Sequence, residues 1–515
     1  MTGSSGILLD GTLGGNTVEG NFLGTDVTGT TAAANQYGVS SQSPGNLIGG
    51  TSLASRNLIS GNSNQGARAL AATSGSGATT VVLNAGSGTR FKNNLIGTRA
   101  TGMTGLANGG GISLSVPDVI IGGTSAAERN IISGNSGTGI QAFASVSSGT
   151  FVSAPTGLTV QGNYIGTTVT GLAALPNTSG GITASGDTTI IGGDNPTPLT
   201  GCTGACNLIS GNAGNGLSLN NSYDNSQTSP TAGTRYSTAA SSVVEGNYIG
   251  VNVTGTLALG NSGGGVQLSA ADIRVGGGSP ATRNVISGQI LNSNSGINAG
   301  SSTFVNTTTG AYVVVGTATG SVIRGNYIGL NAAGTAAIPN HNGISVSVPG
   351  VRVGGTDPTD RNVVSGNNQT GINSFVGLAR PQQGAPIQFS ISVMTVPSEM
   401  IVEGNYVGVS ANGSVAVPNL GGGVRISGIN SRVGGTVGTS ALSCTGPCNL
   451  ISGNTNPDPT RATGVTVSSD HNNATLQANI RIYSDASGSQ VVGNFIGVVR
   501  TAHGTNLGGR RSPTT

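Results

Sequence analysis

Short apolar runs separated by Gly, Asn, Ser and Thr extend along the whole chain. The runs are three to five residues long and rich in β-branched residues, and they end in Gly-Asn or Gly-Gly. Segments such as 112–114, 266–268 and 344–346 alternate apolar and polar residues with the period of two that a β-strand gives. No ten-residue stretch shows the 3.6-residue period of a helix. The pattern predicts an all-β chain in which one face of each strand points into a common core.

Three short phrases recur along the chain at long, similar intervals. The first, Gly-Asn-(Tyr/Phe)-(Ile/Leu/Val)-Gly, recurs at steps of 69 to 89 residues; the second is (Leu/Ile/Val)-Ser-Gly-Asn and the third (Ile/Val)-Gly-Gly. The asparagines of the first phrase are Asn21, Asn163, Asn247, Asn326, Asn405 and Asn494, with Asn94 in a degenerate copy; those of the second are Asn62, Asn135, Asn212, Asn367 and Asn454, with Gln289 in the equivalent slot. Such self-similarity is typical of a solenoid, in which each unit buries its apolar face against the next.

Short stacked strands with asparagines at the corners predict a single parallel β-helix over residues 1–515. Each super-repeat of 70–89 residues holds about six strands, which at three strands per turn makes two coils, and about 13 coils in about 6.5 super-repeats. Three coils per super-repeat is the alternative. The asparagine side chains are expected to hydrogen-bond from coil to coil. The stretches of variable length after Ser-Gly-Asn are expected to leave the coil as lateral loops or hairpins.

The four cysteines lie in two matching loops. These are Cys202-Thr-Gly-Ala-Cys206 and Cys444-Thr-Gly-Pro-Cys448, each on a seven-residue insertion directly before an Asn-Leu-Ile-Ser-Gly-Asn segment. We predict one disulfide within each loop and an extracellular or cell-surface location, where thiols oxidise. A zinc site is the alternative, but the two pairs are three repeats apart and would not converge.

The charge pattern argues against two classes of partner. Charged residues make up 7% of the chain and the net charge is +3, with one lysine, Lys92, and no basic cluster before Arg510-Arg511. Nucleic-acid binding by phosphate neutralisation is therefore not expected. No run of 18 apolar residues is present, so membrane insertion is not expected.

The first six residues lack a signal-peptide pattern, which leaves either a removed signal or an excerpt from a longer chain.

One segment shows all the motifs in order. From Ile120 to Ile182 it contains Ile-Ile-Gly-Gly-Thr, Arg-Asn-Ile-Ile-Ser-Gly-Asn, Gly-Asn-Tyr-Ile-Gly-Thr and Pro-Asn. This series resembles the right-handed parallel β-helix repeats of large bacterial secreted and surface proteins, within the pectate-lyase-like superfamily. The resemblance covers nearly the whole chain and implies that fold, but no single activity. Enzymes of the superfamily act on acidic polysaccharides with two or three carboxylates beside Arg or Lys, or with calcium bound by clustered Asp.

Two slots of the repeat hold charged residues. Glu19, Glu245 and Glu403 share one slot with Lys92, Gln161, Arg324 and Val492. A slot that accepts both signs of charge and an aliphatic residue is expected to be solvated and not catalytic. Arg56, Arg129, Arg283 and Arg361 fill the other slot, where two repeats carry Cys206 and Cys448. The arginines are either a ladder for anionic glycans or, as the replacement by cysteine favours, clamps on their own turns.

The aromatic residues of the first phrase form a third row. Its members are Phe22, Tyr164, Tyr248, Tyr327, Tyr406 and Phe495. If the row faces outward, Tyr164, Tyr248, Tyr327 and Tyr406 form a glycan-contact platform. A packed row that contributes to coil stacking is the favoured alternative.

No catalytic, cofactor-binding or metal-binding residue is predicted. The chain has no phosphate loop, nucleophile elbow or calcium nonapeptide. Two groups are the remaining candidates for a site: Asp357 and Asp360 with Arg352 and His341, and Asp470 and His471 with Arg481 and Asp485. Because no repeat differs chemically from its neighbours, the leading hypothesis is a non-catalytic extracellular structural or adhesive rod, a building block of a cell-surface protein, sheath or filament, with surface glycans as candidate partners. A polysaccharide lyase or hydrolase is the alternative.

Both ends of the solenoid are predicted to be uncapped. Neither terminal segment shows an amphipathic helix or a polar capping unit. A rung of unpaired backbone donors and acceptors is a template for another chain. Head-to-tail docking of this kind gives an open filament, so end-to-end self-association is expected.

Overall fold

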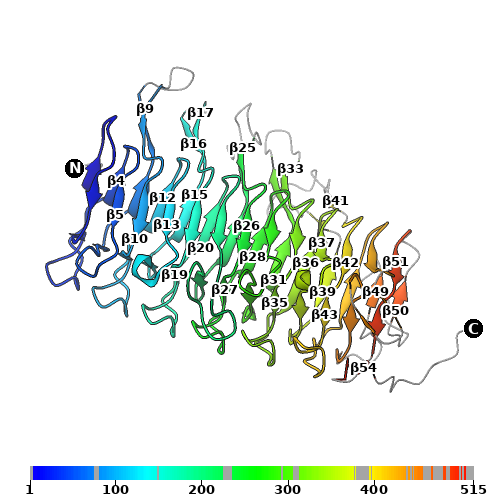
Figure 1. Ribbon diagram of the computed structural model, residues 1–515. Coiled ribbons are helices and arrows are strands. Elements are labelled where there is room, and N and C mark those ends of the chain that lie inside the picture. Colours follow the sequence, from blue (N-terminus) through cyan, green and yellow to red (C-terminus); the bar gives the residue numbers. More distant parts are fainter. Residues whose placement is uncertain are drawn as a thin grey trace, which may run out of the picture.

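Three long parallel sheets, named A, B and C here, wind into a β-helix (Figure 1). The computed structural model describes residues 4–74, 81–147, 150–223, 235–291, 294–305, 312–375, 377–378, 394–395, 397–436, 439–440, 443–444, 446–455, 465–467, 480–482, 488–497, 500–501 and 504–505. Within these residues, sheet A has 14 strands and sheets B and C have 13 each. The parallel β-helix fold expected from the repeats and from the family resemblance is confirmed.

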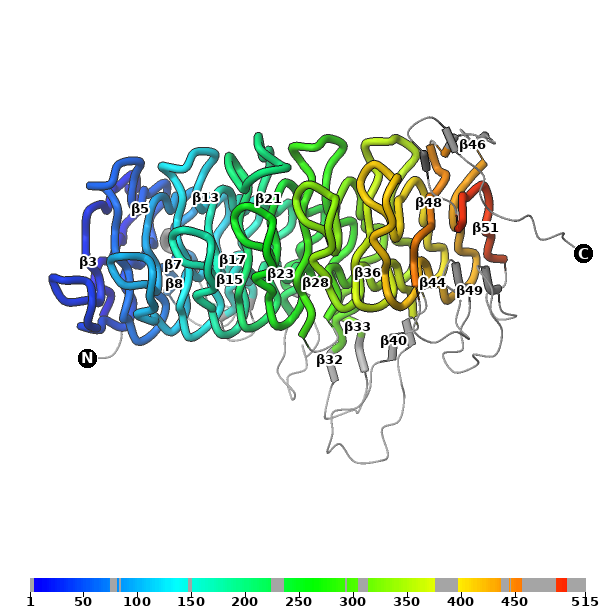
Figure 2. The backbone as a smooth tube through the Cα atoms, turned by 90° about the horizontal axis from the view of Figure 1, so that it is seen from below, coloured from blue at the N-terminus to red at the C-terminus, as the bar shows by residue number. Residues whose placement is uncertain are grey.

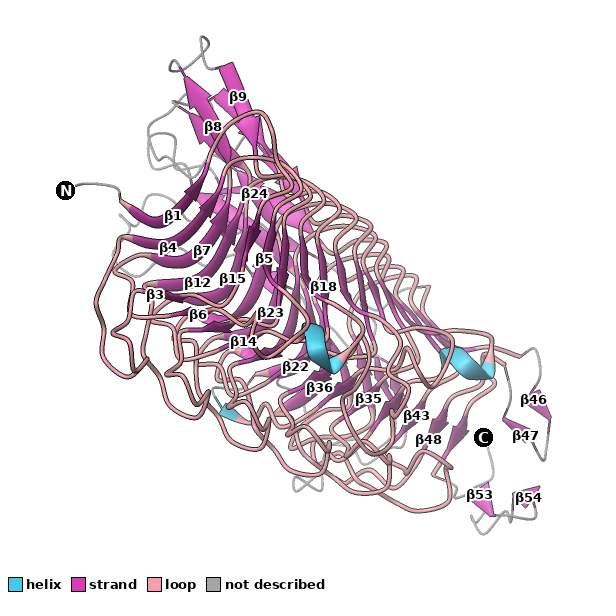
Figure 3. Ribbon diagram, turned by 60° about the vertical axis from the view of Figure 1, so that its left-hand side comes forward, coloured by secondary structure: helices cyan, strands magenta, loops and turns pink. Residues whose placement is uncertain are grey.

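The strands of each sheet stack in chain order (Figure 3). Sheet A consists of β1 (Ser5–Leu9), β4 (Tyr37–Ser41), β7 (Gln65–Ala69), β12 (Gly110–Leu114), β15 (Thr138–Ala142), β20 (Gly180–Ala184), β23 (Asn215–Leu219), β28 (Gly264–Leu268), β31 (Ser295–Ala299), β36 (Asn342–Val346), β39 (Ile372–Ser374), β44 (Val424–Ile426), β49 (Val465–Val467) and β50 (Ile480–Ile482). Sheet B consists of β2 (Thr17–Val18), β5 (Leu47–Gly49), β10 (Arg90–Lys92), β13 (Ile120–Gly122), β18 (Thr159–Gln161), β21 (Ile190–Gly192), β26 (Val243–Glu245), β29 (Arg274–Val275), β34 (Val322–Ile323), β37 (Arg352–Gly354), β42 (Ile401–Glu403), β45 (Arg432–Gly434) and β51 (Gln490–Val492). Sheet C consists of β3 (Phe22–Leu23), β6 (Leu58–Ile59), β11 (Leu95–Ile96), β14 (Ile131–Ile132), β19 (Tyr164–Ile165), β22 (Leu208–Ile209), β27 (Tyr248–Ile249), β30 (Val285–Ile286), β35 (Tyr327–Ile328), β38 (Val363–Val364), β43 (Tyr406–Val407), β48 (Leu450–Ile451) and β52 (Phe495–Ile496).

Each super-repeat makes two coils. Between Asn163 and Asn247 the chain passes through β19, β20 and β21 and then through β22, β23 and β26, which is one strand of each sheet per coil. The two-coil prediction is therefore correct, and the three-coil alternative is wrong.

Antiparallel hairpins leave the coil after sheet A, as predicted for the variable stretches (Figures 1 and 2). They are β8 (Ala71–Ser74) with β9 (Val81–Ala85), β16 (Ser145–Ser147) with β17 (Thr150–Ser153), β24 (Asn221–Tyr223) with β25 (Arg235–Thr238), β32 (Ser301–Val305) with β33 (Tyr312–Thr317), and β40 (Gly377–Leu378) with β41 (Met394–Thr395). Elsewhere lie the pairs β46 (Thr439–Ser440) with β47 (Ser443–Cys444) and β53 (Arg500–Thr501) with β54 (Gly504–Thr505), and the 3-10 turns η2 (Ala126–Glu128) and η4 (Pro358–Asp360).

The core is a continuous column of aliphatic side chains inside the coil. In sheet C the parallel register aligns Ile132 with Ile165, Ile165 with Ile209, and Ile209 with Ile249, all of them fully buried. Burial of each such side chain contributes roughly 1.5–3 kcal/mol. In sheet B, a glycine follows the aliphatic pair of each (Ile/Val)-Gly-Gly phrase and allows neighbouring coils to approach closely. Gly192 of β21, for example, has a φ of +90°, and a Cβ there would lie 2.0 Å from the Glu245 carbonyl oxygen. This explains the (Ile/Val)-Gly-Gly phrase.

The predicted asparagine contacts between coils are present, and they form two separate ladders. At the turn from sheet B to sheet C, Asn247 Nδ2 donates to Asn284 Oδ1 at 3.1 Å, while Asn247 Oδ1 accepts from the amide and side chain of Asn207. This first ladder runs through Asn21, Asn57, Asn94, Asn130, Asn163, Asn207, Asn247, Asn284, Asn326, Asn362, Asn405, Asn449 and Asn494.

The second ladder lies at the turn from sheet C to sheet A. It consists of Asn35, Asn62, Asn108, Asn135, Asn177, Asn212, Asn261, Gln289, Asn340, Asn367, Asn419 and Asn454. Gln289 keeps the ladder continuous because its side-chain Oε1 accepts from the backbone N–H of Asn261. The backbone N–H of Gln289 in turn donates to Asn340 Oδ1. The two recurring phrases therefore supply alternate rungs of two different ladders.

A second apolar layer covers the outer face of sheet C. Outward residues such as Leu95, Ile131 and Leu208 are at most 3% exposed. Loops from sheet C to sheet A fold back over them, each closed by a bridge such as Thr167 with Ala174. Successive loops also bond to one another, as in the Val253 amide donating to the Gly171 carbonyl. Sheet C is thus buried on both faces, whereas the sequence predicted one buried face.

Both disulfides join the cysteines within their own loops. The sulfur atoms of Cys202 and Cys206 are 2.00 Å apart, and those of Cys444 and Cys448 are 2.05 Å apart.

We expect the double replacement Cys202→Ser with Cys206→Ser to lower the free energy of unfolding by about 2 kcal/mol, because a short loop removes little entropy from the unfolded chain. Urea unfolding measures this change. Alkylation without reductant followed by mass spectrometry should label no thiol, and four labelled cysteines would contradict the pairing.

Candidate functional site

The outer face of sheet A carries a polar groove midway along the rod. Its floor is built from side chains that point away from the core at equivalent positions of successive strands. The parallel register places Gln267 of β28, Asn298 of β31, Ser345 of β36 and Asn373 of β39 in one row. Asn215 of β23, Ser295 of β31 and Asn342 of β36 belong to a second row three residues earlier in the strands, in which β28 carries Gly264.

The groove encloses a cavity of 200 Å³. This is many times the roughly 10–15 Å³ that one water molecule needs, and gives room for a monosaccharide-sized ligand. Gly263 and Gly264 line it beside Asn294 on one flank, and Phe375 lies directly after β39. The groove therefore combines amide and hydroxyl groups with one aromatic ring.

Two buried amide oxygens in the groove have no partner among the described residues. They are Asn298 Oδ1 and Asn373 Oδ1. Other groove groups are satisfied: Ser295 and Ser345 share a hydrogen bond of 2.7 Å, and Asn215 Nδ2 donates to Ser218 at 3.1 Å. An unsatisfied buried acceptor costs about 1–3 kcal/mol. In the two ladders the amides satisfy one another rung by rung, so these two groove amides differ from the structural ones in having an oxygen without a partner.

The described residues that line the groove carry no titratable side chain. General acid–base catalysis requires such a group within hydrogen-bonding distance of the reacting atoms. The described lining offers neutral amide and hydroxyl groups beside one aromatic ring.

The first acidic group considered from the sequence is not assembled into one site. Asp357 Oδ1 caps η4 by accepting from the Thr359 amide at 2.8 Å, Asp360 pairs with Arg324 at 2.9 Å, and Arg352 pairs with Glu403 at 3.0 Å. Threonine hydrogen bonds hold the pKa of the Asp357 carboxyl below its usual value.

The second acidic group lies largely outside the described residues. Its members Asp470, His471 and Asp485 are among those not described, and only Arg481 falls within a strand, β50. Within the described residues, no three His, Cys, Asp or Glu side chains lie together as a metal site would require.

The tyrosine row does not face solvent. Tyr248 and Tyr406 are at most 1% exposed, and Tyr164 and Tyr327 are 5% and 7% exposed. Their rings point away from the coil but lie beneath the loops that cover sheet C, in the second apolar layer. The glycan-platform interpretation of the row requires open ring faces, so the packed alternative is the correct one.

The arginine slot covers this tyrosine row. Arg129, Arg283 and Arg361 stack over the rings of Tyr164, Tyr327 and Tyr406, each with its guanidinium carbon 4.1 Å from the ring centre. Each arginine thus stacks on the tyrosine ring of the next coil. The sequence had instead suggested that each arginine stabilises the turn in which it lies. Where Cys206 replaces the arginine, the disulfide loop takes over, and Tyr248 Oη donates to the Pro198 carbonyl at 3.1 Å.

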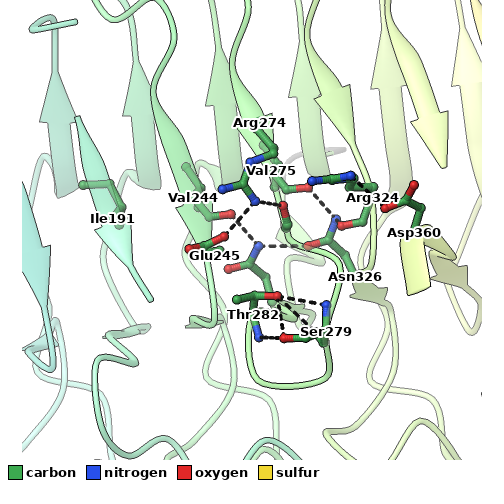
Figure 4. Close-up of polar contacts among 12 residues, drawn as sticks. Ile191, Val244, Glu245, Arg274, Val275, Ser279, Thr282, Arg324, Asn326 and Asp360 are labelled. Atoms are coloured by element: carbon green, nitrogen blue, oxygen red, sulfur yellow. Dashed lines mark hydrogen bonds and ion pairs between the residues drawn. The ribbon is translucent and has the colours of Figure 1, made fainter. Parts of the chain in front are cut away.

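The slot of Glu19, Glu245 and Glu403 is not uniformly solvated, so that prediction is wrong. The Glu403 side chain is 1% exposed and the Glu245 side chain 18%. The arginines that pair with these glutamates occupy a slot of the next coil that the sequence did not reveal. Arg274 pairs with Glu245 at 2.7 Å, and Arg432 pairs with Glu403 at 2.7 Å. Figure 4 shows the Arg274 pair together with the similar pair of Arg324 and Asp360. Arginines on the adjacent coil make burial of these carboxylates tolerable.

The groove residues Gln267, Asn298 and Asn373 were also missed from the sequence. A signal was present, because they occupy the polar position of the alternating segments in sheet A. The lack of a partner at Asn298 Oδ1 and Asn373 Oδ1 depends on the side chains of neighbouring coils, which single segments do not show.

No described helix is long and apolar enough to cross a membrane. No protein family matches the sequence, and no curated protein matches it. Solved structures that are similar to this chain include an epimerase module and a tailspike protein. The A-module of the Azotobacter vinelandii mannuronan C-5 epimerase AlgE6 has 13% identity and a TM-score of 0.37, covering 93% of this chain and 90% of its own. The tailspike protein of E. coli bacteriophage HK620, in complex with a hexasaccharide, has 12% identity and a TM-score of 0.37, covering 93% and 73%.

Proposed function

We propose that the chain is an extracellular, non-catalytic β-helix rod that binds neutral carbohydrate in the groove on sheet A. The observation that carries the proposal is the pair of buried, partnerless amide oxygens, Asn298 Oδ1 and Asn373 Oδ1, in a cavity of 200 Å³. Sugar hydroxyls are donors that would satisfy them, and Phe375 offers an apolar ring for a sugar face. The two disulfides support an extracellular location.

Adhesion is favoured over catalysis by the lining of the groove. A lyase or hydrolase needs titratable groups at the scissile bond, and none lies among the described groove residues. A rod with a fixed surface site is suited to holding a glycan without changing it. End-to-end association of rods stays a prediction, which light scattering of the purified chain at increasing concentration tests.

We expect a neutral glycan found on an array to lose at least about tenfold in affinity when Asn298→Leu and Asn373→Leu are combined, since both acceptors are removed. Isothermal titration calorimetry measures the loss. Gln141→Ala is the matched control, because Gln141 occupies the same outward row on β15 but is exposed and outside the groove. Its affinity should equal that of the unmodified chain. Binding should also be independent of pH between about 5 and 8, because no lining group titrates there.

Two outcomes would overturn the proposal. One is an array on which no neutral glycan binds, and the other is equal binding by the double variant and the unmodified chain. Products released from a bound glycan would favour the enzymatic alternative instead.

A further inference from the structure

The two disulfide loops leave sheet B at equivalent positions, but the surrounding side chains differ. The first loop follows Gly193 and the second follows Gly435. Beside the first, the outward position of β21 is Ile190, and the next coil has Val243 in register with it. Beside the second, the outward position of β45 is Arg432, in register with Gln490. The solenoid therefore presents the same location twice, once apolar and once charged.

The coil that precedes each loop also carries a neutral residue at the first location and a charged residue at the second. Gln161 stands before the first loop, where its Nε2 donates to the Gly192 carbonyl at 2.9 Å. Glu403 holds the equivalent slot before the second loop. Because the first location folds with Gln161, Ile190 and Val243, neither the fold nor the disulfide loop requires charged residues here. Burying charges costs desolvation energy, so the charged version calls for another explanation.

The charges near the second loop do not balance. The Glu403 carboxylate lies between Arg352, at 3.0 Å, and Arg432, at 2.7 Å, which leaves one positive charge in excess. Elsewhere on this sheet the pairs are one to one, as Arg274 with Glu245 and Arg324 with Asp360 (Figure 4). The buried carboxylate accepts a hydrogen bond from Arg432 Nη2 at Oε2, while the Arg432 side chain stays 31% exposed.

A cavity of 840 Å³ opens at this cluster. Its polar lining consists of Thr356, Glu403, Arg432, Thr436 and Gln490. Pro358 lines it from the η4 side, Pro447 from within the second disulfide loop, and Val492 from the next coil. The lining thus combines the Arg432 guanidinium, paired with the Glu403 carboxylate, with hydroxyl, amide and apolar groups. This location is on sheet B and is separate from the groove on sheet A.

We propose that this cavity is a second binding site, which takes a small organic carboxylate with an apolar body. Arg432 Nη1 donates to the Gly434 carbonyl and Nη2 to Glu403, and the remaining N–H groups of this guanidinium are donors for charge-assisted hydrogen bonds to a ligand carboxylate. Gln490 supplies a further amide donor. The proline and valine side chains contact the apolar body of the ligand. Pro447 is held in place by the Cys444–Cys448 disulfide that closes its loop.

The test uses benzoate as the probe and benzyl alcohol as its uncharged counterpart. By isothermal titration calorimetry on the full chain, benzoate should bind at least tenfold more tightly than benzyl alcohol. The Arg432→Ile variant, which places at β45 the residue that β21 already carries, should reduce benzoate affinity at least tenfold. Arg274→Ile removes an arginine of the same sheet outside the cavity and should leave the affinity unchanged.

Folding of each variant is checked by its thermal unfolding curve, and Arg432→Lys retains the charge if the isoleucine variant does not fold. The lysine variant should keep measurable benzoate binding at reduced affinity. The proposal is overturned if the unmodified chain does not bind benzoate, if benzyl alcohol binds equally well, or if Arg432→Ile and Arg274→Ile behave alike. Combined Asn298→Leu and Asn373→Leu should leave benzoate binding intact, which separates this site from the groove on sheet A.

Discussion

Asn247→Ala is expected to lower the free energy of unfolding by about 3–5 kcal/mol. Asn247 is fully buried and lies in the middle of the first ladder. Its Nδ2 donates to the Ile191 and Glu245 carbonyls and to Asn284 Oδ1, and its Oδ1 accepts from Asn207. Each buried group left without a partner costs about 1–3 kcal/mol, and several are lost together. Urea unfolding followed by circular dichroism measures the change.

Asn298→Leu is the matched control for this ladder variant. It also removes an asparagine amide from the rod, but the Asn298 Oδ1 atom has no partner among the described residues. Its replacement should leave the free energy of unfolding unchanged or raise it by about 1 kcal/mol. Equal destabilisation by the two variants would show that the ladder contributes no more than an ordinary asparagine.

Tyr248→Ala is expected to lower the free energy of unfolding by about 3–5 kcal/mol through the cavity it creates. The ring is fully buried between sheet C and the loops that cover it. Burial also raises the pKa of Tyr248 to about 12. The stability that goes with the neutral ring should therefore be complete below the ordinary tyrosine pKa of about 10 and be lost as the pH rises through about 12. Unfolding measured as a function of pH, with ultraviolet titration of the phenol, checks both parts.

Phe22→Ala provides the comparison within the same aromatic row. Phe22 is 47% exposed, so its truncation should change the free energy of unfolding much less than that of Tyr248. Neither variant should alter carbohydrate binding, because neither residue lines the groove on sheet A. A loss of glycan affinity in Tyr248→Ala at unchanged stability would restore the row as a contact surface.

The inward face of the coil follows directly from local pattern. The alternation in segments such as 112–114 and the spacing of the glycines fix which residues point inward, because a strand allows only two side-chain directions. The recurrence of Asn163 and Asn247 at one corner likewise predicts contact, since parallel strands in register align equal positions. What local pattern leaves open is the partner of each asparagine. Asn207, from a different phrase, stands between Asn163 and Asn247 in the ladder.

The outward faces depend on contacts between coils that are distant in sequence. The sequence favoured a packed tyrosine row but left an outward-facing row open, and Tyr164 is buried because a loop and Arg129 lie over its ring. Glu403 likewise reads as solvated until Arg352 and Arg432 are placed on either side of it. Such pairings join residues tens of positions apart, and their chemistry differs from one coil to the next.

The sequence by itself determined the β-helix and predicted the cysteine pairs, because these follow from strict periodicity and from short loops, whereas the structure decided between two and three coils per super-repeat. Only the tertiary structure decided which polar side chains are free to meet a ligand. Asn247 lies at a corner and Asn298 in a strand of similar segments. The Asn247 side chain is hydrogen-bonded to the neighbouring coils, whereas Asn298 Oδ1 has no partner among the described residues. The physical reason is that hydrogen-bond satisfaction belongs to the stack of coils and not to any one of them.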